Sequence, residues 1–307
     1  MTHTLVRRDT TTFKRRLSIT RRLLWVASFV AVMASGTLTY AAEVGPDNGT
    51  LVIVGGGAGP GILKQFVELA GGPEAPLVVI PTAEGARSYD RFHRVAVLLR
   101  EAAGAKDVVV IHTDDRAEAD SEPFVAPIRR ARGVWFSGGR QWRLADSYLG
   151  TRTHYELDAL LARGGVIGGS SAGATIQGSY LARGDTSTNT IMMGDHEQGF
   201  GFLRNTAIDQ HLLRRNRHFD LIEIVKARPE LLGIGLDENT GILVRGDSFR
   251  VIGESYVAIY DHGRLLANGG RFYFLEPGDT FDLKERIPHS GTPRSEPFSN
   301  IREQNWP

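Results

Sequence analysis

The order of hydrophobic and polar positions alternates between two patterns in the first part of the chain. Short apolar runs rich in β-branched residues have the length of buried strands. These runs are Thr50–Val54, Leu77–Ile80, Val108–Ile111, Gly133–Ser137 and Gly165–Gly168. Between them, apolar residues recur at helical spacing, first at Ile62, Phe66 and Leu69 and then at Phe92, Val95, Ala96 and Leu99. This alternation predicts βαβ units and a parallel sheet covered on both faces.

Beyond residue 211 the pattern changes to closely spaced runs. A helical stretch over Phe219–Ala227 precedes three apolar runs, Gly241–Arg245, Ser248–Ile252 and Tyr256–Tyr260, whose spacing is typical of antiparallel hairpins. The segment after Phe281 is polar, contains several prolines and is expected to wrap the surface. We predict an α/β fold with a mainly parallel central sheet and a C-terminal antiparallel hairpin region. It forms a single domain over residues 43–307, with a polar tail from about residue 282.

The first 42 residues have the three-part layout of a secretory signal peptide. A basic stretch ends at Arg22, the apolar run Leu23–Met33 follows, and small residues lead to Ala41 and Ala42, where cleavage is expected. An uncleaved membrane anchor is the alternative, but the apolar run is shorter than the about 20 residues that cross a bilayer. Two pairs of adjacent arginines leave a twin-arginine export route open. We predict a secreted or periplasmic protein.

Composition excludes several classes of function. The formal charge is +1, yet seven basic residues and one acid lie in the first 42 residues, so the remainder is net negative and gives no general case for binding nucleic acid. Cysteine is absent, which removes a cysteine nucleophile and thiolate metal sites. The glycine run Gly55–Gly61 follows the first strand but completes no G-x-G-x-x-G frame. Histidine and acid spacings form no recognisable metal set, so we predict neither metal nor cofactor.

The sharpest local signal is the segment Gly168–Ala174, in which small residues surround Ser171. A buried strand runs into it, and a helix of small residues is predicted over Ala172–Leu181. Such a strand-to-helix turn exposes a serine hydroxyl as a nucleophile. The N–H of Ala172 is the first candidate to hold the oxygen of a tetrahedral intermediate, and Gly138-Gly139 at the end of the preceding strand offers a second. A glycine-rich turn with an incidental serine is the alternative.

A serine nucleophile needs a base, and the base needs an acid that orients it. His211 is distinctive among the nine histidines because an acid, an amide and three arginines flank it within Asp209–Arg217. An apolar strand after Gly233 delivers Asp237 and Glu238 to its end. Since side chains alternate along a strand, only one of these carboxylates should face the histidine, and the residues alone do not decide which.

Four segments together resemble the cyanophycinase family of serine peptidases, which is related to dipeptidase E. They are Phe136–Gln141, Gly169–Ala174, Asp209–His211 with its trailing arginines, and Gly233–Thr240. The resemblance covers nearly the whole chain after the leader. It implies a three-layer glutaminase-like fold with a nucleophile elbow, usually as a homodimer. It also implies hydrolysis of cyanophycin, a poly-aspartate that carries arginine on each side-chain carboxyl, to release β-Asp-Arg.

The resemblance implies roles for individual residues. Ser171 becomes the nucleophile, His211 the base and Glu238 the orienting acid, while Gly139 and Ala172 are the oxyanion donors expected from the turn. The positions expected to contact substrate are Gln141, Asp209, Gln210, Arg215 and Arg217. Such a set suits an Asp-Arg unit, because arginines bind carboxylates and an acid or amide binds a guanidinium.

Two positions depart from the family pattern. Arg140 stands where the family usually has an acid, and Asp220 where it has a further arginine. Both reverse a charge near the expected pocket, so a β-aspartyl or other dipeptidase with a different side-chain preference is an alternative. An α/β-hydrolase esterase would place the acid before the histidine, whereas here the histidine comes first. A secreted binding protein without turnover is the non-enzymatic alternative.

Overall fold

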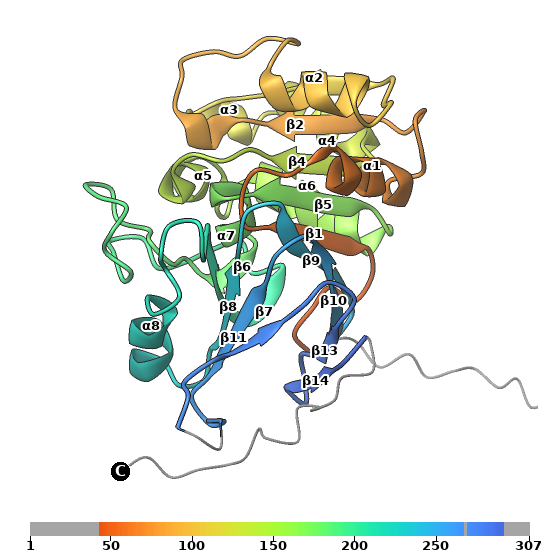
Figure 1. The fold of residues 1–307 in the computed structure, drawn as a ribbon. Coiled ribbons are helices and arrows are strands. Elements are labelled where there is room, and N and C mark those ends of the chain that lie inside the picture. The colour runs from red at the N-terminus through yellow and green to blue at the C-terminus, as the bar shows by residue number, and fades with distance from the viewer. Residues whose placement is uncertain (1–42, 267–268, 292–307) are drawn as a thin grey trace, which may run out of the picture. The chain divides into compact units, whose positions relative to one another are not determined.

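The parallel half of a nine-stranded mixed sheet follows the predicted βαβ pattern. The computed structural model describes residues 43–266 and 269–291. In sheet order the strands are β14 (Ile287–His289), β13 (Thr280–Asp282), β10 (Ser248–Gly253), β9 (Thr240–Arg245), β1 (Thr50–Val54), β5 (Val166–Ser170), β4 (Gly133–Phe136), β2 (Leu77–Ile80) and β3 (Val108–Val110). The strands from β1 to β3 pair in parallel, while β9 pairs antiparallel with β1 and leads into the hairpins (Figure 1).

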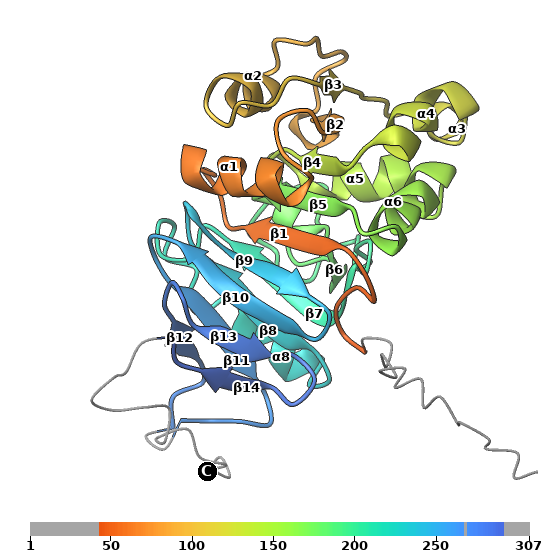
Figure 2. The same cartoon turned by 90° about the vertical axis from the view of Figure 1, so that its right-hand side faces the viewer.

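Helices cover both faces of the parallel strands because the strand residues alternate between two apolar layers. The helices that cover these faces are α1 (Pro60–Leu69), α2 (Arg94–Glu101), α4 (Glu122–Arg130), α5 (Gln141–Tyr148) and α6 (Arg152–Ala162). Val52 and Val54 of β1 pack in one cluster with Phe66 of α1. Leu51 and Ile53 belong to the cluster on the opposite face, together with residues of α4, α5 and α6. Figure 2 shows the two helical layers on opposite sides of the strands, which confirms the α/β class.

A second sheet of five strands corrects the prediction of one central sheet. Its order is β12 (Tyr273–Leu275), β11 (Val257–Asp261), β8 (Leu232–Leu236), β7 (Leu203–Gln210) and β6 (Gly178–Tyr180). Strands β6, β7 and β8 pair in parallel, and β11 and β12 are antiparallel. Ile208 and Ile234 belong to the hydrophobic cluster that also contains residues of the first sheet. Tyr260, on the other face of the second sheet, packs with α8 (Leu221–Ala227). The second sheet therefore brings β7 and β8 against the end of the first.

Three smaller expectations also differ from the structure. Phe92 is 66% exposed and precedes α2, which begins at Arg94, so it does not contribute to the buried face of that helix. The helix predicted over Ala172–Leu181 ends at Thr175, because the next residues form β6 and pair with β7. The polar tail forms β14, which extends the first sheet at its edge instead of only wrapping the surface.

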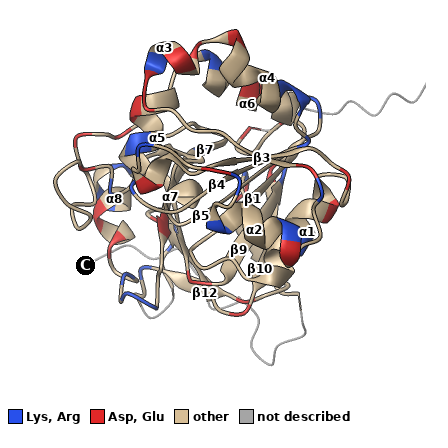
Figure 3. Ribbon diagram, turned by 90° about the horizontal axis from the view of Figure 1, so that it is seen from above, with Lys and Arg blue, Asp and Glu red and all other residues tan. Residues whose placement is uncertain are grey.

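The predicted leader, residues 1–42, lies outside the described residues, as does the end of the tail. The described residues fall within one compact unit, Tyr40–Pro307. Among the helices of the described residues, none has both the length and the apolar character needed to cross a bilayer. Figure 3 shows basic and acidic positions interspersed along the described ribbon in that view.

Candidate active site

Ser171 stands at a strained turn between β5 and α7 (Ala172–Thr175). Its backbone has φ 57° and ψ −115°, a conformation that a non-glycine residue keeps only where its surroundings enforce it. Part of this restraint comes from β1, since the carbonyl of Val54 accepts a hydrogen bond from the Ser171 N–H at 3.0 Å. The turn thus has the strained strand-to-helix geometry of a nucleophile elbow.

His211 follows β7 in the second sheet, and its imidazole reaches the serine. Nε2 lies 2.9 Å from Oγ of Ser171, within hydrogen-bond range. The backbone N–H of His211 donates to the carbonyl of Gly55 at 3.0 Å, which ties this residue to the loop after β1. Ser171 and His211 therefore meet where the ends of two sheets adjoin, whereas the sequence predicts one central sheet.

Glu238 lies beside the other nitrogen of the imidazole. Its Oε1 is 2.7 Å from Nδ1 of His211. The two residues meet because β7 and β8 are parallel neighbours, with Gln210 opposite Leu236, so that the segments just beyond the strand ends come together. An ionised carboxylate only accepts hydrogen bonds, so it places the imidazole proton on Nδ1 and leaves Nε2 to accept the serine proton.

Asp237 has a different set of partners. Its Oδ1 accepts the N–H groups of Leu213 and Arg214 at 3.1 and 3.0 Å, and its Oδ2 accepts the hydroxyl of Ser255 at 2.7 Å. These bonds hold the turn that follows His211. Of the two adjacent carboxylates, Glu238 is thus the one that faces the histidine.

The glycine run after β1 packs against the imidazole. A Cβ added at Gly56 would lie only 2.4 Å from Cε1 of His211, so a side chain there would displace the ring. The carbonyl of Gly56 accepts the N–H of Asn239 at 2.7 Å, and Oδ1 of Asn239 accepts the N–H of Gly59 at 2.9 Å. The loop therefore fixes both the histidine and the segment that carries Glu238. In the sequence, this run is notable only because it fails the G-x-G-x-x-G frame, and no spacing in it indicates contact with a distant histidine.

The loop after β4 borders the serine hydroxyl. A Cβ built on Gly138 would lie 3.6 Å from Oγ of Ser171. Gly139 has φ +132°, and a Cβ there would come within 2.1 Å of the carbonyl oxygen of Ala83, so only glycine fits. Within the described ranges, no hydrogen bond engages the N–H of Gly139 or of Ala172. These two groups remain the candidates for oxyanion donors.

Comparison with known proteins identifies the family. The model of peptidase family S51 matches residues 51–252, which contain Ser171, His211 and Glu238. The chain belongs to peptidase family S51. It is similar to the cyanophycinase of Synechococcus elongatus, with 33% identity over 251 residues, 78% of this chain and 77% of that protein. The cyanophycinase of Geminocystis herdmanii is 30% identical over 265 residues, 78% of this chain and 96% of that one.

A solved structure is similar over most of the same region. The crystal structure of a peptidase from an acI-B1 actinobacterium matches with a TM-score of 0.58 and 26% identity, over 76% of this chain and 97% of that one. Together with the family match, this identifies the chain as a cyanophycinase-like serine hydrolase of family S51. The resemblance stated from the four motifs is thereby confirmed.

The environment of His211 in this S51 peptidase favours its neutral form. Burial lowers the pKa of His211 below its ordinary value of 6.5, and the hydrogen bond that its imidazole donates to Glu238 offsets this only in part. The positive charges of Arg215 and Arg217 lower the same pKa further. An imidazole that is neutral near pH 7 has the free lone pair that proton acceptance requires.

The five residues expected to contact substrate differ in their exposure. Gln141 and Asp209 are fully buried, and Gln210 is 2% exposed. Internal partners occupy the amide N–H groups of Gln141 and both carboxylate oxygens of Asp209, while the amide oxygen of Gln141 is buried without a hydrogen-bond partner among the described residues. Arg217 is 9% exposed and donates to the side-chain and backbone oxygens of Gln210. Of the five, Arg215 alone is exposed.

The two departures from the family pattern both have partners within the chain. The guanidinium of Arg140 donates to the carbonyls of Asp185 and Thr188 at 2.5 and 2.7 Å. Asp220 forms an ion pair with Arg183, a residue that sequence reasoning did not single out. Arg183 lies in a segment without a motif, so the sequence carried no signal for this pairing.

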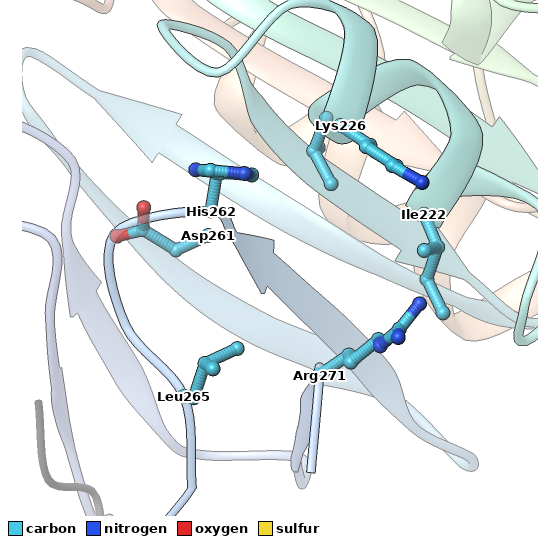
Figure 4. A pocket seen from close by; sticks show the side chains of 7 residues that line it. Ile222, Lys226, Asp261, His262, Leu265 and Arg271 are labelled. Atoms are coloured by element: carbon cyan, nitrogen blue, oxygen red, sulfur yellow. The ribbon is translucent and has the colours of Figure 1, made fainter. Parts of the chain in front are cut away.

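A cavity of about 260 Å³ lies apart from Ser171, His211 and Glu238. Its lining includes Ile222 and Lys226 of α8 on one side and Asp261 and His262 at the end of β11 on the other (Figure 4). Asp261 pairs with Leu232 at the start of β8, whereas Glu238 follows the end of that strand. The cavity is therefore separate from the reacting side chains.

Proposed function

We propose that Ser171, His211 and Glu238 form the catalytic triad of a serine exopeptidase that hydrolyses β-aspartyl peptides. The observation that carries the proposal is the hydrogen-bonded series from Ser171 Oγ to His211 Nε2 at 2.9 Å and from His211 Nδ1 to Glu238 Oε1 at 2.7 Å. Membership of a peptidase family supports hydrolysis, and the cyanophycinase names of relatives at 30–33% identity support the β-aspartyl class of substrate.

The geometry accounts for each proton transfer in such a reaction. As Oγ of Ser171 attacks the substrate carbonyl carbon, Nε2 of His211 takes the hydroxyl proton, while Glu238 stabilises the resulting imidazolium through Nδ1–H. The N–H groups of Gly139 and Ala172 hold the developing oxyanion. The imidazolium then donates its Nε2 proton to the leaving amine, the C–N bond breaks, and an acyl ester remains on Ser171. A water molecule deprotonated by His211 then attacks the ester carbon, the C–Oγ bond breaks, and the imidazolium returns the proton to Oγ of Ser171.

Product analysis tests the proposed function. Purified protein is incubated with cyanophycin, with β-aspartyl dipeptides and with a nitrophenyl ester, and the released products are identified by mass spectrometry. We expect release of dipeptides or amino acids from β-linked substrates, absent in Ser171→Ala. Turnover of the ester alone would support an esterase instead, and binding of peptide without any turnover would support a binding protein.

The pH dependence should follow the lowered pKa of His211. The base is active when neutral, so kcat/KM should fall as pH drops through that pKa, with a midpoint below 6.5 and a plateau near neutral pH. Arg215→Gln removes a positive charge that lowers this pKa, so the acid limb should move to higher pH. A pH–rate profile of kcat/KM measures both. A midpoint above 6.5 would contradict the lowered pKa of His211, and an acid limb that does not move in Arg215→Gln would contradict its assignment to this histidine.

A further inference from the structure

Arg183 is a buried arginine whose guanidinium is bound by two carboxylates. Its side chain is 3% exposed, and that of Asp209 is fully buried. Nε and Nη2 donate to the two oxygens of Asp209 at 2.8 and 3.0 Å, the bidentate arrangement that holds a guanidinium most strongly. Nη2 also pairs with Asp220, and Nη1 donates to the carbonyl of Asn189 at 2.9 Å. The charge reversal at Asp220 therefore supplies a second carboxylate to this arginine.

The backbone of Arg183 is held as well. It has φ 57°, and its N–H donates to the carbonyl of Met192 at 2.9 Å. Nε2 of Gln141 donates to its carbonyl at 2.8 Å. Two residues expected to hold a substrate, Gln141 and Asp209, thus hold the backbone and the guanidinium of the same internal arginine.

This cluster adjoins the proposed base. Asp209 lies on β7 two residues before His211. Arg217 joins the two, because its Nη1 lies 3.9 Å from Oδ1 of Asp209 and donates to the carbonyl of Gln210, the residue before His211. The charge of Arg217 also lowers the pKa of His211. Asp209 and the guanidinium that it binds therefore lie beside the segment that carries the proposed base.

We infer that Arg183 occupies, with its own guanidinium, the place of a cationic substrate side chain, so that this peptidase selects β-aspartyl units that do not carry arginine. The inference rests on the proposed function, since it concerns which side chain the same site accepts. Carboxylate oxygens bind a guanidinium most strongly, and both oxygens of Asp209 are already engaged. A second guanidinium would meet Arg183 and Arg217 instead, and like charges brought together oppose binding.

Other carboxylates near the base are engaged in the same way. Glu238 accepts from His211, and Asp237 accepts from two backbone N–H groups and from Ser255. Arg215, in contrast, is exposed, and it lies near enough to His211 for its charge to act there. Arg215 is thus available to a substrate carboxylate, whereas the carboxylates of Asp209, Asp237 and Glu238 already have partners.

Three short substrates that differ in one group test the selection. They are trimers of aspartyl units joined through their α-carboxyls, and each unit carries arginine, citrulline or leucine on its side-chain carboxyl. Citrulline keeps the length and shape of arginine without its charge. In the unmodified enzyme, kcat/KM for the citrulline trimer should exceed that for the arginine trimer by at least about tenfold. Equal values, or a preference for arginine, would overturn the inference.

Arg183→Ala frees Asp209 and Asp220, so the arginine trimer should gain at least about tenfold relative to the citrulline trimer. Arg286→Ala is a matched control. Arg286 also has a positive φ, 56°, and pairs with a buried carboxylate, that of Asp261 at 2.9 Å, beyond the far end of β8. In this control, kcat/KM for the arginine trimer relative to the citrulline trimer should stay unchanged. An equal change of this ratio in both variants would count against a specific role for Arg183. If Arg183→Ala does not fold, the ratio of kcat/KM for the citrulline trimer to that for the arginine trimer in the unmodified enzyme tests the inference by itself.

Equilibrium binding separates this inference from the proposed function. The dipeptides β-Asp-Arg and β-Asp-citrulline are titrated into Ser171→Ala in a calorimeter. Tighter binding of β-Asp-citrulline supports the inference even if no trimer is hydrolysed, an outcome that would reject the proposed function alone. Tighter binding of β-Asp-Arg, equal binding or binding of neither overturns the inference, whatever the activity of the unmodified enzyme.

Discussion

Replacing Ser171 with alanine should lower kcat for β-aspartyl peptides by about 10⁴-fold or more, because the attacking oxygen is lost. His211→Ala should cost about as much. Oγ of Ser171 and Nε2 of His211 are 2.9 Å apart and transfer one proton between them, so neither is effective without the other. The double variant should therefore be little worse than either single variant. Steady-state kcat with a β-aspartyl trimer measures all three.

Ser170→Ala is the matched control for this series. Ser170 is the neighbouring serine, and it lies at the end of β5 opposite Val54. Its replacement should leave kcat within a few-fold of the unmodified enzyme, and circular dichroism should show the same fold in every variant. Additive losses in the double variant, or a loss in Ser170→Ala as large as in Ser171→Ala, would show that Ser171 and His211 do not work as one unit.

The parallel strands could be predicted because each buried strand is itself an apolar run. Thr50–Val54 and Leu77–Ile80 have in the structure the bounds that the sequence indicates. The second sheet could not be predicted in this way, since hydrophobic periodicity reports how deeply a strand is buried and not which strand lies beside it. The segment Gly178–Tyr180 illustrates this limit. It lies in the segment predicted as the end of a helix, yet parallel pairing with β7 makes it a strand.

The reacting side chains were identifiable because each follows a strand and has distinctive neighbours. The structure brings Ser171, His211 and Glu238 into one hydrogen-bonded series. The choice of Glu238 over Asp237 came from the family resemblance, because strand alternation alone left both open. The placement of Gln141 and Asp209 could not be foreseen, since it depends on a partner, Arg183, whose neighbours form no motif.

Glu238→Gln should lower kcat by about 10³- to 10⁴-fold, less than the loss of Ser171 or His211. A glutamine amide can donate to Nδ1 and so move the imidazole proton to Nε2, which then faces Oγ of Ser171 as a donor and cannot take its proton. Asp237→Asn should retain most of the activity, because asparagine keeps an oxygen for the N–H groups of Leu213 and Arg214. Steady-state kinetics of the two variants, with melting temperatures as a check on folding, distinguishes the carboxylates. A large loss in Asp237→Asn with Glu238→Gln unaffected would assign the orienting role to Asp237.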